Sequence, residues 1–270
     1  MLLYQEIQPS PALRHHIRCY YTFESDSTIQ DTVFPGGFME FIFNLGDGFW
    51  KTQQNERFLT TPPVELWGQI TQPLRVKAGG KNHMLGVRFY PHAASLFLRQ
   101  EASHFNDQVM DLRDVVGGEV VTLYEQLLNT PVSSDRISVL ETWLLQRIAG
   151  ETVLSGKMPL ISQVVNDLSL PDNALTVETV ASRYNISPRY LHKLFVLYTG
   201  IGPKSFMKIR RFRRSLALLR QENESLTAVA YEAGYFDQAH FIREFKAFTG
   251  LVPSAYSADE FPVSQATTES

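Results

Sequence analysis

The sequence predicts two domains of different fold class. Residues 1–150 form an α+β domain, β-rich first and then helical, and residues 157–258 form an all-α domain with two helix-turn-helix units joined by a long helix. Three observations lead to this prediction: a short unit that occurs twice near the C-terminus, a change of hydrophobic periodicity near residue 93, and a reversal of charge near residue 157. A chain of 270 residues is long enough for two cores at roughly 100–150 residues each.

The first 100 residues contain short β-prone segments separated by turn signals. Segment 39–44 is apolar and rich in Phe and Ile, and the Leu-Gly-Asp-Gly sequence that follows it favours a turn. Two Gly-Gly pairs, at 36–37 and 79–80, predict further turns. The expected strands are 19–24, 39–44, 65–69, 74–78 and 84–90.

From Ala93 onward the periodicity is helical. Helices are expected over 120–128 and 135–149, which makes the domain β-rich first and helical after. The second helix carries a narrow apolar stripe formed by Ile137, Leu140, Leu144, Leu145 and Ile148. Two interpretations of this stripe stay open: burial in its own domain and a contact between two copies of the chain.

A short unit occurs twice at an offset of 50 residues. Residues 199–206 read Thr-Gly-Ile-Gly-Pro-Lys-Ser-Phe and residues 249–256 read Thr-Gly-Leu-Val-Pro-Ser-Ala-Tyr. Upstream, Leu191 corresponds to Phe241 and Phe195 corresponds to Phe245. Similarity at a fixed spacing marks a repeated supersecondary unit, and each copy has the layout of a helix-turn-helix.

Caps and turn residues predict the helices of both copies. In the first copy, Thr176 and Ser187 are expected N-caps, Asn185 lies in the turn, and Gly200 ends the second helix. The second copy repeats this plan with N-caps at Thr227 and Asp237, a turn at Gly234 and an end at Gly250.

Residues 204–220 between the copies predict one continuous helix with an apolar stripe and a basic polar side. At 1.5 Å per residue it is about 25 Å long. That length can hold two recognition helices roughly one turn of B-DNA apart, about 34 Å, so one chain could enter two successive major grooves.

The charge distribution agrees with this layout. The chain has a net charge of −3, which by itself argues against a nucleic-acid partner, but residues 1–156 carry −5, residues 157–257 carry +5 and residues 258–270 carry −3. A basic C-terminal module beside an acidic partner domain is expected of a DNA-binding half joined to a sensing or assembly half.

Residues 229–253, which contain Gly234, Asp237, Phe241 and Pro253, resemble the signature of the AraC/XylS family of bacterial transcription regulators. Residues 187–203 fit the same family, and the resemblance covers about 100 residues. Two positions depart from the family pattern: Ala239 lies where a serine is usual, and Ser257 lies where a basic residue is common. Both departures concern local phosphate or capping contacts and leave the fold unchanged.

The resemblance implies that the outward N-terminal positions of the second helix in each unit point into the major groove. These positions are Arg189, His192 and Lys193 in the first unit and Gln238, Ala239, Ile242 and Arg243 in the second. Arginine can pair bidentately with guanine, glutamine with adenine, and alanine or isoleucine can touch the methyl group of thymine.

Three further basic residues are better placed for phosphates, which set affinity more than specificity: Lys246, Arg210 and Arg214. For the arginines of the linking helix the alternative is pairing with Glu222, Glu224 or the N-terminal domain.

The N-terminal domain resembles small N-terminal domains found in some AraC-type regulators, through residues 34–47 and 85–89. Glu40, Arg88 and His92 could line a pocket, and the alternative is a salt bridge or a capped turn. No phosphate loop or nucleophile elbow is present, and His15, His16 and Cys19 lack metal-ligand spacing. We therefore expect no catalytic residues, no metal and no cofactor.

These observations together predict a bacterial transcription regulator that binds double-stranded DNA in two successive major grooves. Expected further partners are RNA polymerase, a small-molecule effector and a second copy of the chain. The alternative is a ligand-binding or enzymatic N-terminal domain whose main output is not transcription. A single cysteine, no secretion signal and no apolar run of membrane length lead us to expect a cytoplasmic protein without membrane contact.

Overall fold

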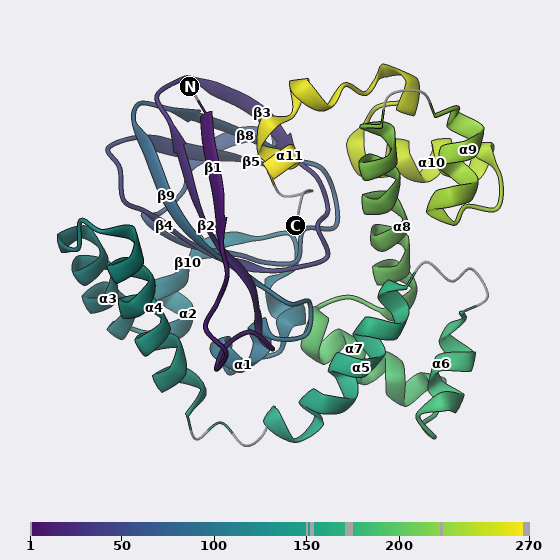
Figure 1. Cartoon of the computed structure of the whole chain (residues 1–270), viewed down its shortest axis with the longest axis horizontal. Coiled ribbons are helices and arrows are strands. Elements are labelled where there is room, and N and C mark those ends of the chain that lie inside the picture. The colour runs from purple at the N-terminus through teal and green to yellow at the C-terminus, as the bar shows by residue number, and fades with distance from the viewer. Residues whose placement is uncertain (1, 150, 152–153, 171–174, 222–223, 267–270) are drawn as a thin grey trace.

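The computed structural model describes residues 2–149, 151, 154–170, 175–221 and 224–266; residue 150, the predicted end of the first domain, lies outside them. Figure 1 shows a strand-rich body with its covering helices beside a helical body, so the predicted order of an α+β domain and an all-α domain is confirmed. Within the part of the chain that the structure describes, we find no helix with the length and apolar character needed to cross a membrane.

The strands of the described residues form two antiparallel sheets. The six-stranded sheet has the order β1 (Leu2–Ile7), β2 (Ile17–Ser25), β9 (Asn82–Phe89), β4 (Glu40–Asn44), β7 (Val64–Trp67) and β10 (Val109–Asp111). The four-stranded sheet has the order β3 (Ile29–Val33), β8 (Leu74–Gly79), β5 (Phe49–Gln54) and β6 (Arg57–Thr60). The five predicted strands correspond to β2, β4, β7, β8 and β9 with ends within two residues, whereas the other five were not predicted.

Alternation of side chains gives the six-stranded sheet two buried faces. Tyr21, Ile42 and Met84 point toward the four-stranded sheet and pack with its Trp50 and Val76. The neighbouring residues point the other way, into a core covered by helices; they are Tyr20, Phe41, Phe43, Leu85 and Val87. The domain is therefore a sandwich of two sheets with helices on the outer face of the larger one.

The helices on that face are α1 (Ala94–Leu98), α2 (Leu112–Val116), α3 (Glu119–Asn129) and α4 (Ser133–Ile148), with the 3-10 turn η1 (Ala102–Phe105). Leu140 and Leu144 of α4 are fully buried in this core, which favours burial over a dimer contact for the predicted apolar stripe. Leu145, at the edge of the same stripe, is 38% exposed, because the helix turns it toward solvent.

The C-terminal helices are α5 (Met158–Ser169), α6 (Val177–Arg183), α7 (Pro188–Thr199), α8 (Pro203–Leu219), α9 (Leu226–Ala233) and α10 (Gln238–Thr249), preceded by the 3-10 turn η2 (Ser155–Lys157). The predicted N-caps at Thr176, Ser187 and Asp237 are confirmed, since each side chain accepts a hydrogen bond from a backbone N–H of the first turn. The N-cap assigned to Thr227 was wrong: Ser225 caps α9, and Thr227 lies inside that helix.

The turn and helix-end residues predicted from the sequence are also confirmed. Gly200, Gly234 and Gly250 end their helices with φ of 83°, 93° and 79°, and Asn185 has φ of 53° in the turn of the first unit. These are left-handed conformations that glycine, and less readily asparagine, adopts at low cost.

The two bodies are packed together along α7 and α8. Asn106, which directly follows η1, donates a hydrogen bond from Nδ2 to the carbonyl of Gly200 at 2.6 Å. Phe34, in the loop after β3, packs edge-on against Phe212 of α8, and Gly37 lies against Ile209 of the same helix. These contacts give the helical module a defined position on the sandwich.

The chain returns to the sandwich after the second unit. After the 3-10 turns η3 (Pro253–Ala255) and η4 (Ala258–Glu260), the short helix α11 (Pro262–Ala266) lies beside β3, as Figure 1 shows. Ser264 donates from Oγ to the carbonyl of Thr32 at 2.6 Å, and Asp31 Oδ2 accepts from the N–H of Val263 at 2.6 Å. The end of the chain is thus tied to the N-terminal domain.

Candidate nucleic-acid interface and N-terminal cavity

Helix α7, the second helix of the first unit, presents basic side chains on its outer face. Its start is fixed by Ser187, whose Oγ accepts a hydrogen bond from the N–H of Tyr190 at 3.2 Å. The inner residues are buried, which leaves the three predicted contact positions exposed to solvent: Arg189, His192 and Lys193.

Helix α10 has the same layout in the second unit. Asp237 accepts a hydrogen bond from the N–H of His240 at 2.6 Å and sets the start of the helix. Gln238 is half-buried, and its Oε1 accepts from Thr227 Oγ1 at 2.8 Å, which ties α9 to α10. Of the other predicted positions, Ile242 is half-buried, whereas three are exposed: Ala239, Arg243 and Lys246.

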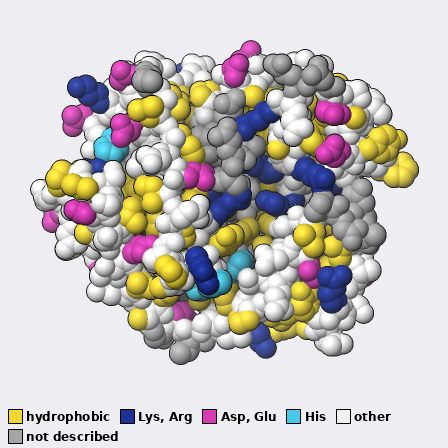
Figure 2. All heavy atoms as spheres, viewed as in Figure 1, with side chains coloured by type: hydrophobic (Ala, Val, Ile, Leu, Met, Phe, Trp, Pro, Cys, Tyr) yellow, Lys and Arg dark blue, Asp and Glu magenta, His cyan; other side chains and the backbone are white. Residues whose placement is uncertain are grey.

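The two arginines of α8 predicted to bind phosphate, Arg210 and Arg214, are both half-buried. Burial, together with the positive charge of Arg18 on β2, lowers the pKa of Arg210. In the view of Figure 2, Lys and Arg side chains gather in a hollow near the middle of the molecule.

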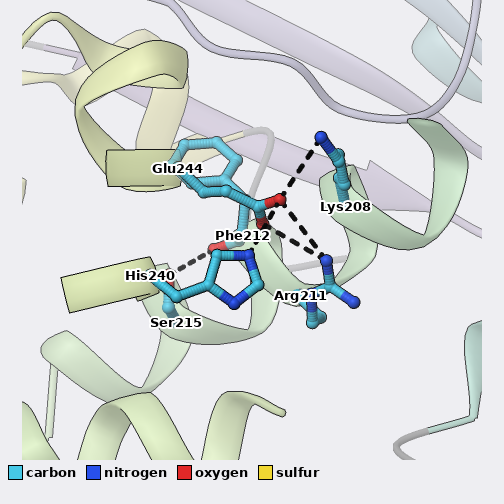
Figure 3. A network of polar contacts seen from close by, with 6 residues as sticks. All are labelled: Lys208, Arg211, Phe212, Ser215, His240 and Glu244. Carbon is cyan, nitrogen blue, oxygen red and sulfur yellow. Dashed lines mark hydrogen bonds and ion pairs between the residues drawn. The ribbon is translucent and has the colours of Figure 1, made fainter. Parts of the chain in front are cut away.

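A buried carboxylate on the inner side of α10 joins that helix to α8. Glu244 is 9% exposed, and its oxygens lie 3.6 Å from Lys208 Nζ, 3.4 Å from Arg211 and 3.4 Å from His240 Nε2. Figure 3 shows these three groups converging on the carboxylate. The network fixes the angle between the linking helix and the second recognition helix. Glu244 was not predicted from the sequence, where its one signal is an acidic residue on the apolar side of a basic helix.

The sandwich contains a partly open cavity between its two sheets. The residues that line it are Tyr4, Tyr21, Phe23, Val33, Glu40, Ile42, Trp50, Glu65, Trp67, Met84, Arg88 and Val263. Val263 belongs to α11, so the C-terminal segment forms part of the wall. The two-sheet construction places aromatic rings and charged groups in the same enclosed space.

Glu40 and Arg88 are both a buried pair and part of the cavity, so the two sequence interpretations hold together. Arg88 donates from Nε to Glu40 Oε1 at 2.8 Å and is fully buried. The carboxylate charge of Glu40 raises the pKa of Arg88 against the opposing effect of burial. His92 does not line the cavity: it is buried beside Tyr90, and burial lowers its pKa to about 4.

Glu65 is a second buried carboxyl of the cavity that the sequence did not single out. It is 1% exposed and accepts hydrogen bonds from Thr61 Oγ1 at 2.7 Å and from the indole N–H of Trp67. Burial raises the pKa of Glu65 to about 7, and these two hydrogen bonds oppose that shift. The carboxyl group can therefore change its charge near neutral pH.

Comparison with known families matches residues 180–259 to a family described as a helix-turn-helix domain. The C-terminal module is a helix-turn-helix domain of the AraC/XylS type. Residues 5–111 match a family described as a domain of unknown function, so that match names no ligand for the sandwich.

Curated relatives match the AraC-type module. An uncharacterised HTH-type transcriptional regulator of Haemophilus influenzae is 33% identical over 89 residues, which is 33% of this chain and 30% of the relative. The uncharacterised HTH-type transcriptional regulator YidL of Escherichia coli is 35% identical over 89 residues, covering 32% and 30%. The chain thus spans about a third of the length of these relatives. Among solved structures, ToxT from Vibrio cholerae is 14% identical, covers 88% of this chain and 96% of its own, and has a TM-score of 0.45.

Proposed function

We propose that this protein is a sequence-specific DNA-binding regulator of transcription, confined to the cytoplasm, with an N-terminal domain of about residues 1–150 and a DNA-binding domain of about 157–258. The observation that supports this most strongly is the pair of recognition helices, α7 and α10, each with a buried inner face and an exposed outer face. The two helices flank α8, whose length suits two successive major grooves.

The residues that we expect to contact DNA divide into two kinds. Arg189, His192 and Lys193 of α7 read the bases of one half-site, and Gln238, Ala239, Ile242 and Arg243 of α10 read the other. Lys246 binds phosphate, and so do Arg210 and Arg214 once they are presented to DNA.

Control comes from the N-terminal domain, through a small molecule or through self-association. Asn106 donates to the carbonyl of Gly200 and Phe34 packs against Phe212, so the N-terminal domain contacts the DNA-binding module beside α7 and along α8. The segment that follows the module is tied to β3 through Val263 and Ser264. A ligand that changed these contacts would shift the population of DNA-competent molecules. RNA polymerase is the partner through which bound regulator acts on transcription.

The test is selection of genomic DNA fragments by the purified full-length protein, followed by a salt titration of the best fragment. We expect a motif with two half-sites about one helical turn apart. Binding without a motif, with only a steep dependence on salt, would mean that the basic surface attracts DNA without reading it, and the proposal would fail.

A further inference from the structure

Three ionisable groups line the cavity of the sandwich: Glu40, Glu65 and Arg88. Arg88 is neutralised by Glu40 at 2.8 Å and approached by Glu6 at 3.4 Å. Glu65 has no Lys, Arg or His within ion-pair distance among the described residues. When Glu65 is ionised, its buried carboxylate makes a site of negative potential, and a ligand of positive charge would both neutralise it and favour its ionised form.

The walls of the cavity are mainly aromatic. Five rings line it, contributed by Tyr4, Tyr21, Phe23, Trp50 and Trp67. The face of an aromatic ring is negative, and rings around a desolvated space attract alkylated ammonium groups that water hydrates weakly. An amine with free N–H groups would need several hydrogen-bond acceptors, whereas a quaternary ammonium group needs only such a surface.

Trp50 adds a hydrogen-bond donor. Its indole N–H is buried, with the residue 4% exposed, and has no acceptor among the described residues. Buried donors are nearly always satisfied in folded proteins, so an unsatisfied one in a cavity wall suggests an acceptor on the ligand.

We propose that this cavity binds a small organic cation, a quaternary ammonium group with a nearby oxygen, held by Glu65, the surrounding rings and the N–H of Trp50. The inference rests on the proposed ligand control and names the chemical class of that ligand. Because Val263 lines the same cavity, the bound cation also contacts α11. Occupancy is thereby linked to the segment that follows the DNA-binding module.

An anionic ligand is the natural rival, since an arginine lines the cavity. Arg88 is a poor anchor for an anion because Glu40 and Glu6 already accept from it and its guanidinium lies 5.1 Å from the ring centre of Tyr21 and 4.6 Å from that of Phe38. An anion would also meet the carboxyl group of Glu65. The charge arrangement thus favours the cation.

Three probes of nearly the same shape separate these cases: choline, its neutral analogue 3,3-dimethyl-1-butanol, and the anion 3,3-dimethylbutanoate. Their affinities for the full-length protein are measured by titration calorimetry, and by quenching of tryptophan fluorescence, because two of the three tryptophans line the cavity. We expect choline to bind roughly 30-fold more tightly than the neutral analogue, and the anion to bind most weakly. Equal affinity for choline and its neutral analogue, tightest binding of the anion, or no binding of any probe up to about 10 mM would overturn the proposal.

Glu65→Gln keeps the size of the side chain and removes its charge. We expect this variant to lose the preference for choline over the neutral analogue, whereas Glu125→Gln, at an exposed position on α3, keeps it. The wild-type probe series decides the question even if Glu65→Gln fails to fold. Binding of DNA half-sites is measured separately without a probe, so failure of the cation proposal leaves the DNA-binding proposal standing, and the reverse also holds.

Discussion

The two helix-turn-helix units share a local plan but differ in their attachment to the rest of the molecule. In the first unit, Leu191 and Phe195 of α7 belong to one continuous core with the helices that cover the sandwich. In the second unit, Phe241 and Phe245 of α10 belong to a separate core, to which, among the residues that the structure describes, the N-terminal domain contributes Phe34 alone. The first unit is therefore built into the N-terminal domain, and the second is joined to it mainly through α8 and the C-terminal segment.

The glycines that end the two recognition helices show the same contrast. Gly200 and Gly250 have similar backbone angles, but a Cβ on Gly200 would collide with Asn106 Oδ1 and lie 3.2 Å from the carbonyl of Ala102, whereas a Cβ on Gly250 would meet nothing. The two glycines thus end their helices in the same way, but only Gly200 is also packed closely against the N-terminal domain. The N-terminal domain therefore contacts α7 directly, whereas α10 is joined to it mainly through α8 and the C-terminal segment.

The largest expected difference between the two units is in the loss of unfolding free energy when alanine replaces each of these glycines. Gly250→Ala introduces only the left-handed backbone cost, about 1 kcal/mol, whereas Gly200→Ala adds overpacking against η1 and lowers the free energy of unfolding by about 3–4 kcal/mol. Chemical denaturation of both variants checks this. Equal losses of unfolding free energy in the two variants would show that Gly200 is not closely packed against the N-terminal domain.

The next effect is a dependence of stability on pH that originates in the sandwich. Because burial raises the pKa of Glu65 from 4.5 to about 7, its contribution to the free energy of unfolding is complete below pH 4.5. That contribution is lost as pH rises to about 7, a change of about 3 kcal/mol. Chemical denaturation of wild type and Glu65→Gln should be measured between pH 5 and 8. The free energy of unfolding should fall with rising pH more in wild type than in the variant, because only wild type has the titrating carboxyl group.

This pH effect also sharpens the comparison of the two units. Hydrogen exchange in α7 should accelerate with rising pH more than exchange in α10, after correction for the intrinsic rate. The neighbours of Glu65 on β7, Val64 and Leu66, pack in the core to which α7 contributes fully buried residues, whereas α10 reaches that core only through the partly buried Phe248 among the described residues. A uniform acceleration in both helices, or a slope that persists in Glu65→Gln, would contradict this explanation.

A smaller effect concerns the carboxylates that brace each unit. Glu244 joins α10 to α8, and in the first unit Asp167 of α5 accepts from Arg183 at 2.7 Å and from the hydroxyl of Tyr184 at 2.9 Å. We expect Glu244→Gln and Asp167→Asn each to lower the free energy of unfolding by about 1–2 kcal/mol. Binding assays on fragments with one altered half-site should show that each change weakens only its own unit. Loss at both half-sites from either variant would mean that the two units move as one body.

The sequence predicted the helical module more fully than the sandwich, for a physical reason. The signals that predict the helices act within one or two turns, so neighbouring residues of the sequence are enough to recognise them. These signals are the N-caps, the apolar stripes, Gly200 and Gly250. The mistaken cap at Thr227 arose because Ser225 and Thr227 can both cap, and packing of the first turn decides between them.

Strands depend on partners that are distant in the chain, so half of them were missed. β1 alternates between half-buried and exposed positions, and three of the four residues of β6 are exposed, so neither carries a strong apolar signal. Glu65 and α11 were missed for a similar reason: the roles of Glu65 and Val263 come from long-range packing that no local pattern records. Glu40 and Arg88 could be named from the sequence, but their pairing could not be decided.

If α7 and α10 read separate half-sites, Arg189→Ala and Arg243→Ala should each weaken binding at a different half-site. The decisive measurement is the affinity of wild type and of each variant for the selected fragment, intact and with either half-site scrambled. We expect each variant to bind the intact fragment with about 10- to 100-fold lower affinity than wild type. Scrambling the half-site that the variant no longer reads should lower its affinity no further. Additive losses at both half-sites for both variants, with only the salt dependence changed, would contradict this prediction.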